Sequence, residues 1–324
     1  MTSPRTTLKH LKKLNQYLAT LPLQVQQSAC FEWLVAQAFS HILYLPFFSS
    51  DNDDASISHR VIWLGSETNL SRAPQNANAP PNSPDAIAYA YKFYILIEST
   101  LKTGANQWTQ EFAQSLRHCD DFVSRTGAHP NEVYIVLVAP KLYIDTYWSI
   151  RQNPRSGFNF ILLEVPELAK ILETSILAFT MRHLELRRLL NQVPQCIANS
   201  SSLRDFHKLL NDWIKGWRQD VLKLEKNAFI GVKSYKVMKE IGRTHIGVSE
   251  ILRKLQAHPI VLQYFNIIDS KVSVSDVIES LYQQKLGFRL TPTTDGEEIF
   301  EPVPALDFKA RESRLIKAVE EING

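Results

Sequence analysis

Apolar and polar positions follow two different periods along the first half of this chain. Apolar residues recur at helical spacing through residues 6–43, where Pro22 divides the pattern into two predicted helices, and again over 107–125. Short apolar runs typical of strands lie at 61–64, 86–91, 93–100, 133–138 and 160–163. Helices and strands that alternate in this way predict an α/β domain built in layers.

The second half of the chain has an almost wholly helical pattern. The pattern is continuous over about 176–224, and three shorter patterns follow at 235–241, 248–256 and 274–284. An amphipathic helix is predicted at 309–322. A chain of this length is expected to form about two domains. We therefore expect an α/β domain at 1–175 and a mostly helical domain at 176–324.

A predicted β-hairpin follows the three short helical patterns. Its strands are 287–291 and 298–302, and Asp295-Gly296 between them is a strong turn signal. Three helices and a hairpin resemble a winged helix, in which one helix lies in the major groove of DNA and the hairpin contacts the backbone. A small helical dimerisation or scaffold domain is the alternative. The side chains expected to contact DNA are Arg253, Lys254, Ser275, Lys285 and Arg289.

Two acidic residues flank the strand runs at 86–91 and 93–100. If these strands form an antiparallel hairpin with its turn centred between Tyr91 and Lys92, Asp85 faces Glu98 directly. Tyr91-Lys92 lacks the Gly or Asn that a tight two-residue turn prefers, so a wider loop or a shifted register is the alternative.

Side-chain alternation along the second strand adds further polar groups to the same face. Glu98, Thr100 and Lys102 are expected to share that face, so it combines two carboxylates, a hydroxyl and an ammonium group. Mg²⁺ takes oxygen ligands and is commonly bound by one or two carboxylates together with substrate phosphates. The pattern therefore predicts a magnesium site suited to phosphodiester hydrolysis.

The same residues carry a resemblance to a known family. Pro84-Asp85 followed by Glu98-Ser99-Thr100 resembles the Pro-Asp…(Asp/Glu)-x-Lys signature of restriction-endonuclease-like proteins. Glu98-x-Thr100-Leu101-x-x-Gly104-x-x-Gln107, followed by Arg117-His118, is similar to the AlwI-type restriction endonucleases. The resemblance covers about residues 25–165, and it implies a central mixed sheet flanked by helices.

The resemblance also implies roles for individual residues. Asp85 and Glu98 would be metal ligands, and Glu32 would add a direct or water-mediated contact, unless it is a solvated helix residue. The lysine expected two residues after Glu98 is Thr100, so either Lys102 takes its place or Thr100 orients the attacking water. The residues expected to support the metal site or face the DNA backbone are Gln107 and Glu111, unless both are surface residues. The nearby His118 is interpreted as structural.

Composition limits the remaining function classes. The 324 residues carry a formal net charge of +3, and the three cysteines favour neither a disulfide framework nor a zinc site. No signal-peptide core or membrane-length apolar run is present, so we expect a cytoplasmic protein with no membrane partner. Between Arg182 and Pro259 there are 15 lysines and arginines against 7 acidic residues. Such an excess suits contacts with phosphates, or a solvated surface.

The function predicted from these features is a type II-like restriction endonuclease. It would hydrolyse phosphodiester bonds in specific double-stranded DNA with Mg²⁺, and cutting both strands implies a homodimer. The alternatives are a repair or transposition nuclease on branched or single-stranded DNA, and a non-catalytic winged-helix DNA-binding protein. The sequence lacks a Gly-rich phosphate loop, a nucleophile elbow and a paired-histidine metal helix, which argues against other enzyme classes.

Overall fold

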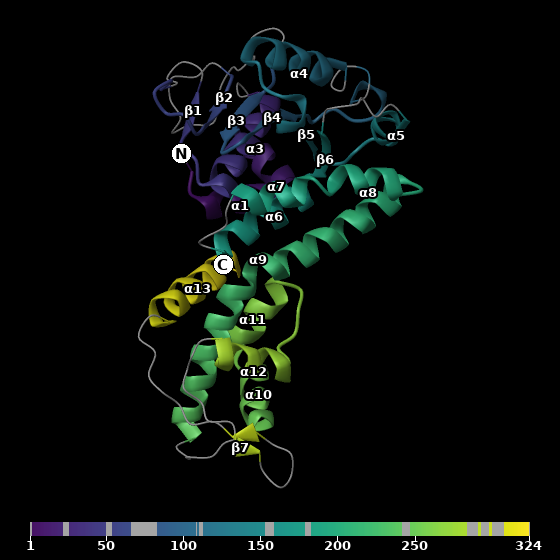
Figure 1. Cartoon of the computed structure of the whole chain (residues 1–324). Coiled ribbons are helices and arrows are strands. Elements are labelled where there is room, and N and C mark those ends of the chain that lie inside the picture. Colours follow the sequence, from purple (N-terminus) through teal and green to yellow (C-terminus); the bar gives the residue numbers. More distant parts are fainter. Residues whose placement is uncertain are drawn as a thin grey trace. The chain divides into compact units, whose positions relative to one another are not determined.

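The chain divides into two compact units, Met1–Ile214 and Lys215–Gly324, and each is described by itself (Figure 1). The division falls later in the chain than the boundary expected at residue 175. The computed structural model describes residues 2–21, 26–49, 54–65, 83–107, 109, 113–152, 159–178, 183–241, 247–283, 291–292, 298–299 and 308–323.

A six-stranded mixed sheet forms the centre of the first unit. Its strands lie in sequence order, with β1 to β2 and β4 to β5 to β6 parallel and the pairs β2–β3 and β3–β4 antiparallel. The strands are β1 (Phe47–Ser49), β2 (Arg60–Trp63), β3 (Ala86–Ala90), β4 (Phe93–Ser99), β5 (Val133–Ala139) and β6 (Asn159–Glu164). The five strands predicted from apolar runs are confirmed. Strand β1 was not predicted, because three residues are too few to show a period.

Helices cover both faces of this sheet, which explains why every residue of β5 is buried. Helix α3 packs against β2, β3 and β4, whereas α4 packs against β5, and Figure 1 shows α3 and α4 on opposite sides of the sheet. Helix α6 packs on both α1 and α3. The helices of this unit are α1 (Pro4–Lys12), α2 (Leu14–Ala19), α3 (Gln27–Leu43), α4 (Ala113–Thr126), α5 (Ile144–Gln152), α6 (Val165–Leu177), α7 (His183–Leu190) and α8 (Val193–Asn199).

The β3–β4 hairpin has the register predicted from the sequence. Ala86 pairs with Ile97 and Ala90 with Phe93, so the turn consists of Tyr91 and Lys92. Lys92 has a φ of 65°, a left-handed conformation that is uncommon outside glycine and asparagine. The predicted two-residue turn is therefore confirmed in spite of its unfavourable residues.

A tertiary contact supports this turn. The Tyr91 amide donates to His183 Nδ1 over 3.2 Å, and His183 Nε2 lies 2.7 Å from the carbonyl oxygen of Leu43. The two contacts fix one tautomer, in which Nδ1 accepts and Nε2 donates. Helix α7 thereby ties the turn to the end of α3.

The second unit is mostly helical in its described part. Helix α9 (Leu203–Ile241) crosses the unit boundary, so the pattern predicted at 235–241 is its last part. The other helices are α10 (Val248–Gln256), α11 (Pro259–Ile267), α12 (Val274–Gln283) and α13 (Phe308–Asn323). Helix α10 packs against α11 and α12, and α11 packs against α13.

The predicted C-terminal hairpin is present as a short ladder. Strand β7 (Thr291–Pro292) pairs antiparallel with β8 (Glu298–Ile299), and the predicted turn at Asp295-Gly296 lies outside the described residues. Helix α11 was not among the predicted helices. The winged-helix interpretation stays a prediction. Among the described residues, no helix is long and apolar enough to cross a membrane.

A partly buried network of charged side chains joins the first turns of α9 to the junction between β6 and α6. His207 Nδ1 lies 2.8 Å from Glu167 Oε1, and His207 Nε2 lies 3.2 Å from Glu164 Oε1. Burial disfavours the charged imidazole, but hydrogen bonds and charges from both glutamates outweigh it and raise the pKa of His207 to about 9. The ring is therefore protonated at neutral pH and completes an ion-pair network.

Because of this network, we expect the protein to lose stability as the pH becomes alkaline. Because the folded pKa lies above the ordinary value of 6.5, the stabilisation is complete below pH 6.5 and is lost as the pH rises through about 9. We expect a loss of about 1–2 kcal/mol, discounted for partial solvent screening. Thermal unfolding of wild type and His207→Gln across this range measures it. Parallel pH dependence in both proteins would contradict the assignment.

Candidate active site

Asp85 lies one residue before β3, and Glu98 lies one residue before the end of β4. The paired ladder ends with Ala86 opposite Ile97, and continuing its register by one residue places Asp85 opposite Glu98. The carbonyl of Asp85 accepts from the amide of Leu64 over 2.9 Å, so the residue is held by the chain after β2 as well. The two acids therefore lie next to each other at this end of the hairpin.

The Asp85 carboxylate is fixed by the residue that follows Glu98. Its Oδ2 atom accepts from the Ser99 amide over 2.7 Å and from Ser99 Oγ over 3.0 Å. The next amide, of Thr100, donates instead to the carbonyl of Val138 over 3.0 Å. The end of β4 is therefore bonded on one edge to the side chain of Asp85, just before β3, and on the other to the backbone of β5.

The Glu98 carboxylate is fixed by a histidine from α4. Glu98 is 4% exposed, and its Oε1 atom lies 2.7 Å from His118 Nδ1. Burial of a carboxylate without a partner is costly, so this contact accounts for a buried acid at the end of a strand. The sequence interpretation assigned His118 no functional role, although Arg117-His118 belonged to the family resemblance.

Thr100 and Lys102 do not share a strand face. Strand β4 ends at Ser99, and Thr100 Oγ1 accepts from the amide of Lys102 over 3.0 Å, which closes a short turn. Thr100 is buried, whereas Lys102 is exposed. Strand alternation ends at Ser99, so it does not place Lys102 on the face of Glu98, and the role of Lys102 stays a prediction.

Gln107 is neither a surface residue nor a group facing a metal. Its side chain is completely buried and its hydrogen bonds join backbone segments: Nε2 donates to the carbonyls of Lys102 and Lys141, over 3.2 and 3.0 Å. Glu111, its predicted companion, lies outside the described residues.

The carboxylates of Asp85 and Glu98 suit a hard cation. Mg²⁺ prefers carboxylate oxygens and completes its octahedron with waters and substrate phosphates, so two neighbouring acids fit it. Within the described residues, no group of three or more histidine, cysteine, aspartate or glutamate side chains is placed to hold a metal ion. Glu32, a half-buried residue of α3, is therefore not part of a three-residue ligand cluster there.

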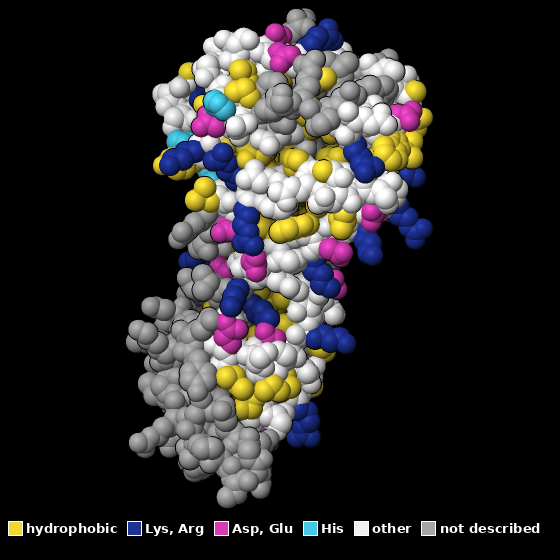
Figure 2. Space-filling model, turned by 45° about the vertical axis from the view of Figure 1, so that its right-hand side comes forward, with side chains coloured by type: hydrophobic (Ala, Val, Ile, Leu, Met, Phe, Trp, Pro, Cys, Tyr) yellow, Lys and Arg dark blue, Asp and Glu magenta, His cyan; other side chains and the backbone are white. Residues whose placement is uncertain are grey.

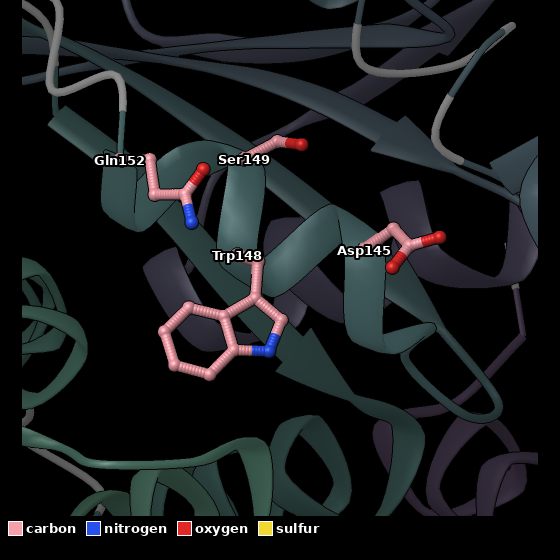
Figure 3. A pocket seen from close by; sticks show the side chains of 4 residues that line it. All are labelled: Asp145, Trp148, Ser149 and Gln152. Atoms are coloured by element: carbon pink, nitrogen blue, oxygen red, sulfur yellow. The ribbon is translucent and has the colours of Figure 1, made fainter.

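A surface pocket lies on α5, and none of its lining residues is among the predicted site residues. It is lined by Asp145, Trp148, Ser149 and Gln152. Figure 3 shows these side chains spreading from one helix without converging on a common point. The Arg151 guanidinium lies 5.1 Å from the centre of the Trp148 ring. This arrangement brings together no set of groups with an evident catalytic use.

Three of the five residues predicted to contact DNA lie within the described residues. Arg253 and Lys254 are exposed neighbours on α10, opposite its buried residues Val248, Ile251 and Leu255. Ser275 is exposed on α12, and its hydroxyl lies 2.8 Å from that of Ser273. Lys285 and Arg289 lie outside the described residues. On the face in Figure 2, lysine and arginine side chains are scattered, with acidic ones among them.

A comparison with protein families agrees with the sequence resemblance. Residues 70–154 match the model of the AlwI restriction endonuclease family, and this range contains Asp85, Glu98 and His118. No curated protein matches the chain. A solved structure similar to the chain is the small subunit, R.BspD6I2, of the heterodimeric restriction endonuclease R.BspD6I. It has 16% sequence identity and a TM-score of 0.47, and the alignment covers 67% of this chain and 98% of that one.

The matched range begins before β3 and ends just after α5, so it spans the hairpin, α4 and β5. It therefore includes both opposed acids and the histidine bonded to one of them. Over this range, which is about a quarter of its length, the chain is similar to the AlwI restriction endonuclease family.

Proposed function

We propose that this protein is a Mg²⁺-dependent endonuclease that cleaves specific sequences in double-stranded DNA. The observation that carries the proposal is the opposition of Asp85 and Glu98 at the end of the β3–β4 hairpin, with each carboxylate fixed by its own partner. Burying a charged acid lowers the stability of the fold, so stability does not explain why Glu98 is an acid. A pair of carboxylates already held in place is what a metal site requires.

Asp85 and Glu98 are the residues that would hold Mg²⁺. When bound, the ion would supply activation of a water molecule and neutralisation of charge at the scissile phosphate. Ser99 keeps the Asp85 carboxylate oriented through two hydrogen bonds, from its amide and from its hydroxyl. Partners of this kind fix ligand geometry and tune ligand basicity.

His118 performs the corresponding role for Glu98. Its Nδ1 atom lies 2.7 Å from Glu98 Oε1 and orients that carboxylate. We assign to the His118 imidazole the proton-handling role that the family signature gives to a lysine. Thr100 holds the turn after β4, and Lys102, exposed in that turn, is assigned to the DNA phosphate.

Replacing His118 by Ala is expected to weaken the metal site. Alanine has no group that can make the 2.7 Å contact with Glu98, so the carboxylate loses its fixed orientation. Outer partners of metal ligands typically contribute about 10–100-fold in metal affinity or activity, so the Mg²⁺ concentration for half-maximal cleavage should rise by about that factor. His59→Ala, at an exposed histidine, is the control. Unchanged Mg²⁺ dependence in His118→Ala would contradict this role.

Recognition of DNA is assigned to the second unit. Phosphate contacts supply affinity independent of sequence, and contacts to base edges supply specificity. Arg253 and Lys254, exposed side by side on α10, are the described residues proposed for these contacts. We further propose that two copies act together, because both strands of a duplex must be cut.

The test of this function is cleavage of a mixed-sequence plasmid by the purified chain, with and without Mg²⁺. We expect discrete fragments that appear only with Mg²⁺, and sequencing of their ends gives the recognition site. Cleavage confined to branched or single-stranded DNA would favour a repair-type nuclease instead. Salt-sensitive binding of duplex DNA without any cleavage would identify a binding protein and overturn the proposal.

A further inference from the structure

The Gln107 side chain uses its complete hydrogen-bonding capacity in the interior. A primary amide offers two N–H donors and an oxygen with two lone pairs. Nε2 donates to the carbonyls of Lys102 and Lys141 over 3.2 and 3.0 Å. Oε1 accepts from the amide of Tyr143 over 2.6 Å and from Thr146 Oγ1 over 3.3 Å. No other common side chain of this length offers the same two donors and two acceptors.

One end of this arrangement reaches the candidate active site. The carbonyl of Lys102 accepts from Gln107 Nε2, and the amide of the same residue donates to Thr100 Oγ1 over 3.0 Å. Thr100 follows Ser99, whose amide and hydroxyl hold the Asp85 carboxylate. The turn that leaves β4 is therefore fixed at both of its ends, by the sheet and by Gln107.

The other end of the arrangement lies in the connection from β5 to α5. Lys141 and Tyr143 belong to that connection, and Thr146 is a buried residue in the first turns of α5. The amide of Leu142, between them, donates to Glu164 Oε1 over 2.9 Å. Since Glu164 ends β6, the exits of the three parallel strands β4, β5 and β6 are joined by one chain of hydrogen bonds.

We propose that Gln107 is a positioning residue for cleavage. It sets the path of residues 100–102 beside Glu98 by tying that segment to the β5–α5 connection, and it acts through the backbone without touching DNA or metal. The proposal rests on the nuclease function proposed above.

The variant that separates this role from simple packing is Gln107→Glu. The side chain keeps its size and its two acceptors, but as a carboxylate it loses both donors and directs lone pairs at the carbonyls of Lys102 and Lys141. Thr146→Val is the matched control, because it removes one long contact at the α5 end and leaves the bond to Lys102 intact. Gln107→Asn, which is too short to reach both carbonyls, serves if the glutamate variant does not fold.

Two measurements on the full-length chain test the proposal. The first is amide hydrogen exchange, in which Gln107→Glu should accelerate exchange in both 100–107 and 140–147, while Thr146→Val affects only the second segment. The second is single-turnover cleavage of plasmid DNA, where a rate about 10–100-fold lower is expected for an outer positioning partner, with unchanged DNA affinity measured in Ca²⁺.

The two measurements distinguish failure of the proposed nuclease function from failure of the positioning role of Gln107. If wild type does not cleave DNA, the proposed function is overturned, while the exchange data still decide whether Gln107 joins the two segments. If wild type cleaves and Gln107→Glu cleaves at the same rate, the positioning role is overturned. Acceleration of exchange in 100–107 alone would likewise overturn it, because the link to the β5–α5 connection would be absent.

Discussion

Replacing Glu98 by Gln is expected to abolish Mg²⁺-dependent cleavage while leaving the fold intact. Gln has the shape of Glu and can still place an oxygen against His118, but it removes the negative charge from a buried position that is 4% exposed. Metal catalysis of this kind supplies several kcal/mol of transition-state stabilisation, so the rate should fall by at least about 10³-fold. The same loss is expected for Asp85→Asn.

The control for both variants is Asp145→Asn, which makes the same change of charge at an exposed acid of α5. Cleavage rates at saturating DNA, together with thermal unfolding of each protein, form the measurement. Glu98→Gln that unfolds like wild type and still cleaves within a few-fold of its rate would show that the metal is held elsewhere. Equal losses in Asp145→Asn would show that the effect is one of net charge.

Replacing Phe122 by Ala is expected to destabilise the first unit by about 3–5 kcal/mol, the usual cost of removing a buried phenylalanine. Phe122 is 1% exposed, and its ring meets those of Tyr94 and Tyr89 at centroid distances of 5.3 and 6.4 Å. It lies one helical turn after His118 on α4, so it packs the helix against the hairpin that carries the candidate site.

Urea unfolding measures this loss, and Phe122→Leu is the control because it retains most of the buried volume. We also expect Phe122→Ala to lower the cleavage rate at temperatures where it stays folded, since α4 then holds His118 less firmly against Glu98. A stability loss under about 1 kcal/mol would show that α4 is not anchored through this ring.

The hairpin at the centre of the candidate site could be predicted from the sequence because its information is local. The length and composition of 86–91 and 93–100 gave the two strands, and antiparallel pairing with a two-residue turn left one register. The opposition of Asp85 and Glu98 followed from that register alone. The turn residues Tyr91 and Lys92 argued against a tight turn, because neither is Gly or Asn. His183 supports the turn through a contact that cannot be seen in the local sequence.

The roles of Lys102, Gln107 and His118 could not be read in the same way. Strand alternation could not be extended to Lys102, because β4 stops at Ser99 and the sequence does not mark that end. Gln107 resembled a polar residue at the start of a helix, and only the folded chain brings four backbone and side-chain groups around it.

By itself, the sequence determined the strands, the hairpin register and the pair of acids, because these depend on periodicity and on residues close together in the chain. The tertiary structure alone decided which partner fixes each acid, because a buried charge is stabilised by whichever group the packing of distant elements brings to it. Ser99 reaches Asp85 across the hairpin, and His118 reaches Glu98 from a helix twenty residues further along.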